Sequence, residues 1–266
     1  MSTAAAYEEV LRITRREAKN FAYGIMVLPR EKRRAIAAIY AFARAVDDVA
    51  DGDLAPAEKR TQLEALRVAL DAPPAGAMFV ALADARARFG IPRAALSRLV
   101  DGGLQDLERP TYATFDELRG YCEKVAGAVG VACIAVYGSE DVERANTLGI
   151  ALQLINIMRD VQEDETLGRV YLPQDELARF GVGELAHTPQ FVELMRFQAQ
   201  RARAHLEEGL RLLESLDRRS ALCVATFAGL YSGQLDRMEA NDFDVFDKSC
   251  RLSTRAKLGV VARNLL

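Results

Sequence analysis

The stretch "NIMRDVQEDETLGRVYLP" (156–173) places acidic side chains at the end of a segment whose apolar spacing predicts a helix. Gln153, Asn156, Asp160 and Asp164 fall at i, i+3, i+7 and i+11. Successive helical residues are about 100° apart, so these four form one stripe, with an apolar face behind it. Helices usually turn such charges to water. The alternative is a group of acids that faces inward, toward a ligand.

A second segment, "AIYAFARAVDDVAD" (38–51), repeats the arrangement. Tyr40, Arg44, Asp47 and Asp51 fall at i, i+4, i+7 and i+11, again on one stripe. Each segment thus carries two aspartates four residues apart, about 6 Å from each other on a helix, where they repel when ionised. One such pair usually lies on a solvated face. Two pairs, on stripes free of mixed Lys and Glu, favour two helices that face each other across a cavity.

Oxygen ligands without His or Cys indicate Mg²⁺, which prefers few carboxylates together with water and phosphate oxygens. Two acidic walls therefore predict a substrate that carries a diphosphate, which bound Mg²⁺ would convert into a leaving group. Loss of diphosphate leaves a carbocation, so the rest of the cavity must exclude water and offer apolar or aromatic walls. Arg44 and Arg159 lie within a turn of the aspartates and are placed to hold phosphate oxygens.

The remainder of the chain predicts an all-α protein. Apolar residues recur three and four positions apart between breakers such as "DAPPAGA" (71–77) and "ERPTY" (108–112), and alternation of period two is almost absent. We expect about eight to ten helices around one core, in a single domain that covers residues 1–266. The clearest helical segments are 57–70, 93–107, 114–137, 141–165, 191–215 and 218–238.

Bulk properties narrow the function. A formal charge of −3 gives no basic surface for nucleic acid. The four cysteines lack metal-binding spacing and are typical of reduced thiols, which predicts a cytoplasmic protein. We expect no signal peptide and no stretch that is long and apolar enough to span a bilayer.

Three motifs resemble signatures of the squalene/phytoene synthase family. They are "NFAYGIMVLPREKRRAIAAIYAFARAVDDVAD" (20–51), "YCEKVAGAVG" (121–130) and "LGIALQLINIMRDVQEDETLGRVYLPQDELARFGV" (148–182). The resemblance runs from about residue 10 to about residue 258 and implies the all-helical isoprenoid-synthase fold. It also implies two or three Mg²⁺ ions between two acidic helices. Where many members carry a serine just before the first aromatic, this chain has Asn20 before Phe21.

The resemblance implies roles for individual residues. The metal ligands would be Asp47, Asp48, Asp51, Asn156, Asp160 and Asp164. The residues that would hold the diphosphate and the carbocation are Asn20, Phe21, Tyr40, Arg44, Tyr121, Gln153, Arg159, Tyr171 and Tyr231. Catalysis would involve the four aspartates of the two pairs together with Arg44, Arg159, Tyr121 and Tyr231. Gly127 and Gly130 would mark a helix break beside the cavity.

Within the family, the compact length and the intact run "RDVQED" (159–164) resemble the bacterial presqualene diphosphate synthases of hopanoid biosynthesis. Two farnesyl diphosphates would then join head to head into presqualene diphosphate. No strand–GxGxxG–helix unit is present, so no NADPH is predicted. Phytoene or dehydrosqualene synthesis remains an alternative, as do a head-to-tail prenyltransferase, a terpene cyclase and a non-catalytic helical interaction protein. Products this apolar suggest loose contact with the inner face of the membrane; prenyl chain length and oligomeric state stay open.

Overall fold

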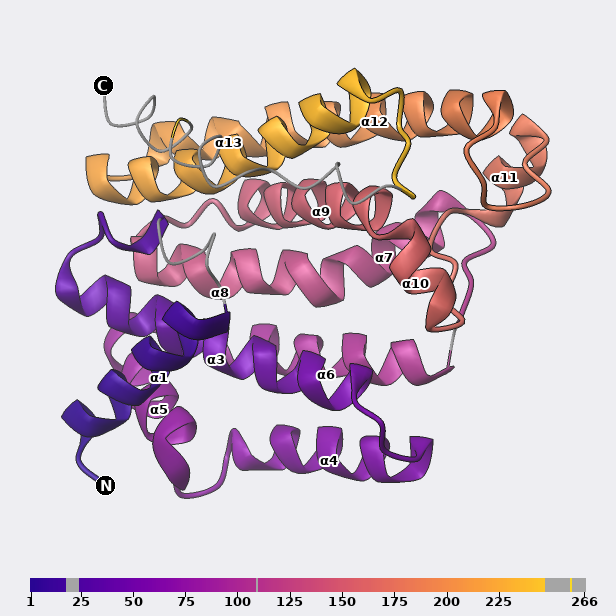
Figure 1. Cartoon of the computed structure of the whole chain (residues 1–266). Helices are drawn as coiled ribbons and strands as arrows, with labels where there is room; N and C mark the ends of the chain where they lie inside the picture. Colours follow the sequence, from indigo (N-terminus) through magenta and orange to yellow (C-terminus); the bar gives the residue numbers. More distant parts are fainter. Residues whose placement is uncertain (18–23, 109, 247–258, 260–266) are drawn as a thin grey trace.

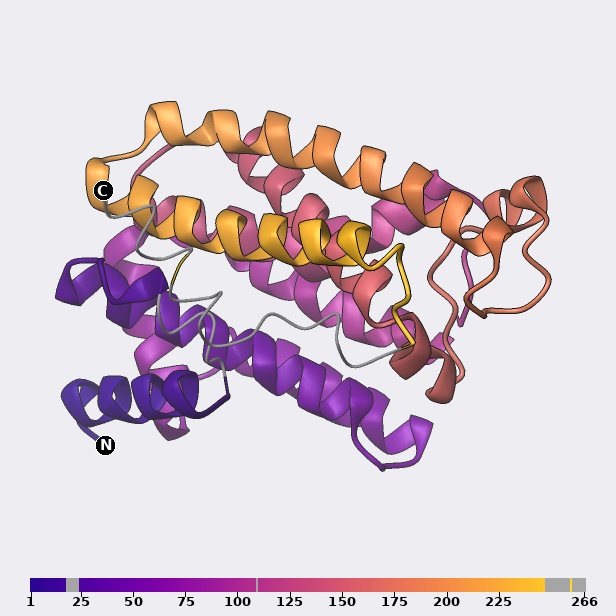
Figure 2. The ribbon, with the colours of Figure 1, turned by 45° about the horizontal axis from the view of Figure 1, so that its top comes forward.

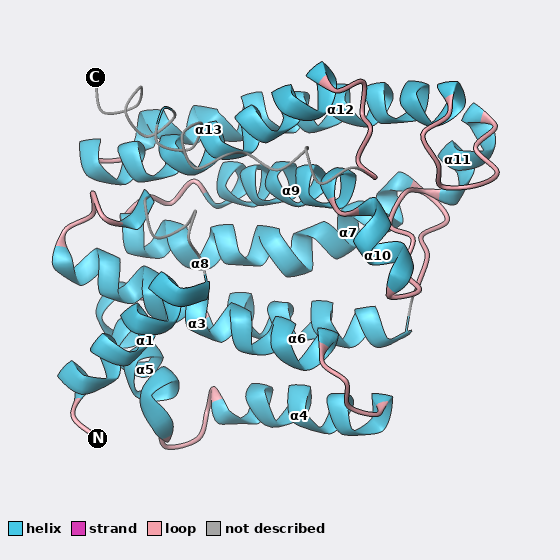
Figure 3. Ribbon diagram, in the orientation of Figure 1, coloured by secondary structure: helices cyan, strands magenta, loops and turns pink. Residues whose placement is uncertain are grey.

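The computed structural model describes residues 1–17, 24–108, 110–246 and 259. In this part of the chain the regular structure is helical, as expected, and strands are absent apart from one isolated bridge between Thr111 and Val170 (Figure 3). The α-helices are α1 (Thr3–Glu17), α3 (Arg30–Asp51), α4 (Pro56–Ala69), α5 (Gly76–Phe89), α6 (Arg93–Glu108), α7 (Phe115–Cys122), α8 (Ala128–Tyr137), α9 (Val142–Arg159), α10 (Val161–Thr166), α11 (Gln174–Phe180), α12 (Pro189–Leu210) and α13 (Arg218–Ala240).

The long helices lie side by side as a bundle (Figures 1 and 2). Helix α9 packs against both α8 and α12, and α6 packs against α3, α4 and α8. Helices α1 and α5 cover the first half of α3, while α10, α11 and the loops around them gather at the opposite end of the bundle. The acidic ends of α3 and α9 therefore point toward the same end of the molecule.

Helix α3 has an apolar side that packs into the core, and this leaves its charged stripe facing the cavity. Ile39, Phe42 and Val46 form its buried apolar side. Its alanine-rich sequence favours a helix, which ends where the Gly52 amide donates to the Asp48 carbonyl at 3.1 Å. Buried apolar residues of α1, α3, α5, α6 and α8 form one cluster, and those of α7 form another; α9 and α12 contribute to both.

The expected helix over 114–137 contains an irregular turn. Residues Glu123–Gly127 form a π-helical turn (η1) between α7 and α8. Gly127 closes this turn against α9, because a Cβ added there would lie 2.0 Å from Asn146 Oδ1. The predicted break near Gly127 is thus a widened turn within a continuous helical path, of the kind often found at functional sites.

One expectation about membranes needs correction. The run Phe115–Tyr137 is long and apolar enough to cross a bilayer by length and composition. It packs against α6 and α9 inside the bundle, however, and half of its most apolar stretch is buried. Such contacts are those of a core helix, and the apolar composition follows from burial on several sides.

Candidate active site

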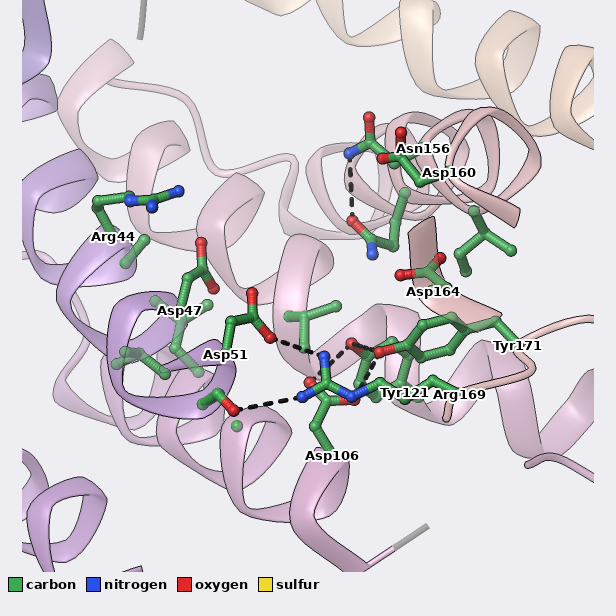
Figure 4. A pocket seen from close by; sticks show the side chains of 18 of the residues that line it. Arg44, Asp47, Asp51, Asp106, Tyr121, Asn156, Asp160, Asp164, Arg169 and Tyr171 are labelled. Carbon is green, nitrogen blue, oxygen red and sulfur yellow. Dashed lines mark hydrogen bonds and ion pairs between the residues drawn. The ribbon is translucent and has the colours of Figure 1, made fainter. Parts of the chain in front are cut away.

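A cavity of about 500 Å³ lies between the ends of α3, α6, α7 and α9 and the loop that follows α10 (Figure 4). Most of the side chains around it are polar or charged. The described residues that line it are Glu17, Tyr40, Ala43, Arg44, Val46, Asp47, Ala50, Asp51, Leu99, Gly103, Asp106, Tyr121, Val125, Gln153, Asn156, Ile157, Arg159, Asp160, Asp164, Arg169, Tyr171 and Tyr231.

The two aspartate pairs face each other across this cavity. Asp47 and Asp51 project from the last turns of α3, and Asp160 and Asp164 come from the opposite wall (Figure 4). On both sides of the cavity, the aspartates that the sequence places on one helical stripe therefore face the same space. This arrangement gives two separate acidic walls with space for a ligand between them.

The second acidic helix is not continuous. We expected one helix over 141–165, but α9 ends at Arg159 and α10 begins at Val161, because Asp160 adopts φ −100° and ψ 13°. Backbone bonds from Asp160 to Asn156 (2.9 Å) and from Asp164 to Asp160 (2.8 Å) bracket the break and keep Asp164 on the cavity side. Beside the break, the Asp160 carboxylate accepts a hydrogen bond from the Arg159 guanidinium at 2.7 Å.

Desolvation raises the pKa of one acid on each wall. Asp47 is reachable by solvent from the cavity but enclosed by protein on its other sides, and this desolvation, reinforced by Asp51, raises its pKa to about 7. Desolvation and the neighbouring Asp160 likewise raise the pKa of Asp164 to about 7. Neither Asp47 nor Asp164 has an ion-pair partner within the described ranges. Ionisation of these two carboxylates is thus unfavourable, and a bound cation would offset its cost.

A carboxylate that the sequence reasoning missed lies at the base of the cavity. Asp106 of α6 accepts hydrogen bonds from the hydroxyls of Tyr171 (2.9 Å) and Tyr121 (3.0 Å). Burial raises its pKa to about 6, although Arg169 and the two hydroxyls oppose the rise. The signal was present: Leu99, Gly103 and Asp106 fall at i, i+4 and i+7, so a carboxylate lies on the buried stripe of α6.

Three arginines reach the cavity, each bound to a different aspartate. Arg44 pairs with Asp48 on the same helix at 2.5 Å. Arg159 binds its neighbour Asp160 and also donates to Gln234 Oε1 at 3.2 Å. Arg169, the second residue that the sequence reasoning missed, extends from the loop after α10 and contacts Asp51 across the cavity at 2.7 Å.

The other predicted site residues fall into three groups: those that line the cavity, one that does not, and two that lie outside the described residues. Tyr40, Tyr121, Gln153, Asn156, Tyr171 and Tyr231 all line the cavity together with the paired aspartates, Arg44 and Arg159. Asp48 is not among the lining residues; its side chain is 57% exposed and bound to Arg44, because it lies about 100° around the helix from Asp47. Asn20 and Phe21 lie outside the described residues.

The residues present suit a hard cation such as Mg²⁺. The Asn156 side-chain oxygen is buried and has no hydrogen-bond partner in the described structure, while its amide nitrogen faces Gln153 Oε1 at 3.4 Å. An orphaned amide oxygen beside two carboxylate pairs is a donor set that Mg²⁺ accepts. Within the described ranges no three acidic, His or Cys groups converge closely enough to hold an ion by themselves. Phosphate oxygens would have to complete the coordination.

Fold and site together define an all-α protein with one cavity between two acidic walls. The family model for squalene/phytoene synthase matches residues 14–258, and the chain belongs to this family of prenyltransferases. The phytoene synthase of Mycobacterium tuberculosis is 45% identical over 273 residues, which cover 98% of this chain and 90% of that protein. The 15-cis-phytoene synthase of Synechococcus elongatus is 36% identical and covers 97% and 91%.

Solved structures agree with the fold. A dehydrosqualene synthase in complex with a ligand superposes with a TM-score of 0.89 at 26% identity, over 99% of this chain and 96% of that one. The squalene synthase HpnC from Alicyclobacillus acidocaldarius gives a TM-score of 0.83 at 27% identity, over 91% and 95%. These are similarities to squalene-type synthases, whereas the curated sequence relatives above are phytoene synthases.

Proposed function

We propose that this chain joins two prenyl diphosphates head to head, and that farnesyl diphosphate is its substrate and presqualene diphosphate its product. The observation that carries the proposal is the pair of facing acidic walls, Asp47–Asp51 and Asp160–Asp164, around one cavity. Two walls can hold two diphosphate groups in register, which is what a condensation of two identical substrates requires. The intact acidic run around Asp160 supports an enzyme that ionises a fresh allylic diphosphate.

The chain's own groups would divide the work at the two ends of the substrate. Asp47, Asp51, Asp160, Asp164 and the Asn156 amide oxygen would hold Mg²⁺, which when bound supplies the positive charge that lets diphosphate leave. Arg44 and Arg159 line the same cavity and would donate to phosphate oxygens. Because these positive groups would surround the diphosphate end of the substrate, the bond that ionises is the one between the diphosphate and its carbon.

The remaining wall suits a carbocation. Val46, Leu99, Val125 and Ile157 contribute apolar surface, and Tyr231 contributes an aromatic ring. Apolar walls exclude the water that would otherwise trap the cation, and an aromatic face attracts positive charge. The C1 cation of one substrate would be attacked by the 2,3-double bond of the second, and loss of a proton closes the cyclopropane ring.

A second candidate is phytoene synthesis from two geranylgeranyl diphosphates. The 45% identity to a phytoene synthase over nearly the whole chain favours it. Both candidates share the acidic walls, the first ionisation and the cyclopropane. They differ in the length of the prenyl chain and in whether the cyclopropyl diphosphate is ionised a second time, with loss of the second diphosphate, to give a hydrocarbon. The choice of substrate therefore depends on the apolar part of the site rather than on the aspartates.

Product identification separates the candidates. The purified protein would be incubated with Mg²⁺ and either farnesyl or geranylgeranyl diphosphate, with and without NADPH, and the products analysed by mass spectrometry before and after phosphatase treatment. We expect a C30 cyclopropyl diphosphate from farnesyl diphosphate alone, without NADPH. A C40 product from geranylgeranyl diphosphate only would select phytoene synthesis. A cyclic C15 product, or elongation that needs isopentenyl diphosphate, would overturn the head-to-head proposal.

A further inference from the structure

The loop between α10 and α11 carries Arg169 across the cavity to the end of α3. Gly168, at φ 74°, makes the turn that a residue with a side chain would resist. The Arg169 amide then donates to the Asp164 carbonyl at 2.9 Å, and the Val170 amide donates to the Pro110 carbonyl at 2.7 Å. The backbone of Arg169 is thus anchored on both sides, and its side chain has a defined direction.

The Arg169 guanidinium donates two hydrogen bonds to the opposite wall. One nitrogen donates to Asp51 Oδ1 at 2.7 Å and another to the Ala50 carbonyl at 3.3 Å. The Arg169 side chain is only 12% exposed, whereas that of Asp51 is 54% exposed. A buried cation therefore holds one oxygen of a carboxylate that otherwise opens into the cavity.

This contact differs from those of the other cavity arginines. Arg44 binds an aspartate on its own helix, and Arg159 binds the residue next to it in sequence. Arg169 and Asp51 are 118 residues apart and connect the two acidic walls. The described lining residues include six carboxylates and three guanidinium groups. Acidic groups therefore outnumber basic ones, and the loss of one arginine makes the cavity more negative.

We propose that Arg169 competes with Mg²⁺ for Asp51: it holds this carboxylate when no metal is bound, and it is displaced when Mg²⁺ and diphosphate bind. This inference rests on the proposed function, because it takes Asp51 as a metal ligand. Mg²⁺ needs short, nearly octahedral contacts to its oxygens, and it repels a guanidinium that holds the same carboxylate oxygen. Arg169 and Mg²⁺ therefore compete for Asp51.

Displacement gives Arg169 a second role. Its anchored backbone keeps the freed guanidinium between the two walls, where the diphosphate must lie, and a planar guanidinium can donate two parallel hydrogen bonds to phosphate oxygens. The same side chain therefore weakens the binding of Mg²⁺ alone and strengthens the binding of Mg²⁺ together with diphosphate. Metal is retained mainly when substrate is present.

These opposite effects make the proposal testable. Calorimetric titration of the free protein with Mg²⁺ alone should give a dissociation constant at least ~5-fold lower for Arg169→Gln than for the wild type, since removal of a competitor releases the coupling between the two cations. The KM for farnesyl diphosphate should rise roughly 10-fold, as expected when a charge-assisted hydrogen bond to phosphate is lost. A purely structural role for Arg169 would instead weaken both.

Lys59→Gln is the matched control. Lys59 donates to the same Ala50 carbonyl at 2.8 Å, so this variant removes one positive charge from the same end of α3 without touching Asp51. Its Mg²⁺ affinity should stay within about 2-fold of the wild type. Arg169→Lys, which keeps the charge but loses the fork of donors, should fall between the wild type and Arg169→Gln.

Two results would overturn the proposal: Mg²⁺ binding by Arg169→Gln that is unchanged or weaker, or an equal gain in Lys59→Gln. Crystals of the wild type soaked with Mg²⁺ and inorganic pyrophosphate provide a test that does not depend on a variant folding. There the bond between Arg169 and Asp51 should be absent, and its persistence with metal on Asp51 would also contradict displacement. Asp51→Asn separates a failure of the metal assignment from a failure of the proposed role of Arg169. An unchanged Mg²⁺ affinity in this variant would refute Asp51 as a metal ligand, on which the inference depends, whereas a loss of affinity would leave the role of Arg169 to be decided by Arg169→Gln.

Discussion

Tyr121 and Tyr171, which are 50 residues apart, stack with ring centroids 5.2 Å apart and place their hydroxyl oxygens 3.3 Å from each other over the carboxylate of Asp106. Burial and the adjacent Asp106 raise the pKa of both phenols, so they act as neutral donors. The two phenols thereby hold a carboxylate ionised at the base of a cavity that already contains four aspartates. This links α6, α7 and the loop after α10 into one polar base.

Removal of either hydroxyl should therefore alter the ionisation of Asp106. Tyr171→Phe takes away a donor that lowers the pKa of this carboxyl, which now lies at about 6, so the pKa rises. The acidic limb of the kcat/KM–pH profile should move to higher pH, with activity near neutrality reduced roughly 10-fold. Tyr112→Phe is the control, because the Tyr112 ring stacks on that of Tyr171 and packs at a tilt against that of Tyr121, while its hydroxyl accepts from Gln105. An unshifted profile in Tyr171→Phe would rule out this role.

Replacing the paired aspartates should abolish turnover without making the protein less stable. Asp47→Asn and Asp160→Asn remove one carboxylate from each wall, and we expect activity to fall at least ~1000-fold because charge on the departing diphosphate is no longer neutralised. Steady-state assays and thermal unfolding of the same preparations check both parts. Asp53→Asn, an exposed acid just beyond α3, should behave as the wild type. Near-normal turnover in Asp47→Asn or Asp160→Asn would refute the metal assignment.

Metal-free stability should decline as the pH rises. The unfolded chain ionises its aspartates near pH 4, whereas the folded pKa is about 7 for Asp47 and Asp164 and about 6 for Asp106. Between these values the folded state binds more protons, so the raised pKa contributes stability that is fully present below pH 4 and is lost as the pH passes through 7. Other groups add their own pH dependence, which the difference between Asp47→Asn and the wild type removes: the stability of the variant relative to the wild type should increase from about pH 5 to about pH 8.

Mg²⁺ should reverse this trend. A bound cation favours ionised carboxylates, so the increase in Tm on adding saturating Mg²⁺ should be larger near pH 8 than near pH 5. Scanning fluorimetry of the wild type at both pH values measures it, with Asp47→Asn as the variant in which the difference should shrink. Equal Tm increases at the two pH values would mean that metal does not act on these carboxylates.

The sequence predicted the long helices and the two acidic walls, because both depend on local periodicity, but it predicted about eight to ten helices where the described residues form twelve α-helices. The predicted segments 57–70 and 93–107 correspond to Pro56–Ala69 and Arg93–Glu108. The same reasoning placed the aspartate stripes on faces that do meet across a cavity. Long-range features were less accessible, since spacing along one helix does not say which loop will approach it.

Asp106 and Arg169 illustrate that limit. The charge of Asp106 lies on an otherwise buried stripe of α6, a signal that was readable, but its tyrosine partners come from two other segments. Arg169 lies in a loop, where no periodicity fixes the direction of a side chain. The break at Asp160 could not be predicted from the spacing of the carboxylates, because backbone hydrogen bonds on both sides of the break preserve that helical spacing.

A buried ion pair behind the cavity should set the position of the loop that carries Arg169 and Tyr171. Glu176, on α11, binds Arg201 through both of its oxygens at 2.5 and 3.0 Å and accepts from Gln198 at 2.5 Å. The Arg201 guanidinium lies 3.7 Å from the centre of the Phe115 ring. The Glu176 and Arg201 side chains are only 9% and 16% exposed, so the pair is tightly enclosed.

Glu176→Ala leaves the Arg201 charge buried without its carboxylate, and we expect the free energy of unfolding to fall by about 3–5 kcal/mol. Urea denaturation measures this loss, with Asp175→Ala as the matched control on the exposed neighbouring position, where the change should stay below about 1 kcal/mol. Glu176→Gln keeps hydrogen-bonding oxygen and should lose less. Since Tyr171 lies five residues before Glu176, loosening of α11 should also lower kcat more than it raises KM. A folded Glu176→Ala variant with normal stability would show that the pair is replaceable and that backbone bonds to residues 110–113 hold the loop instead.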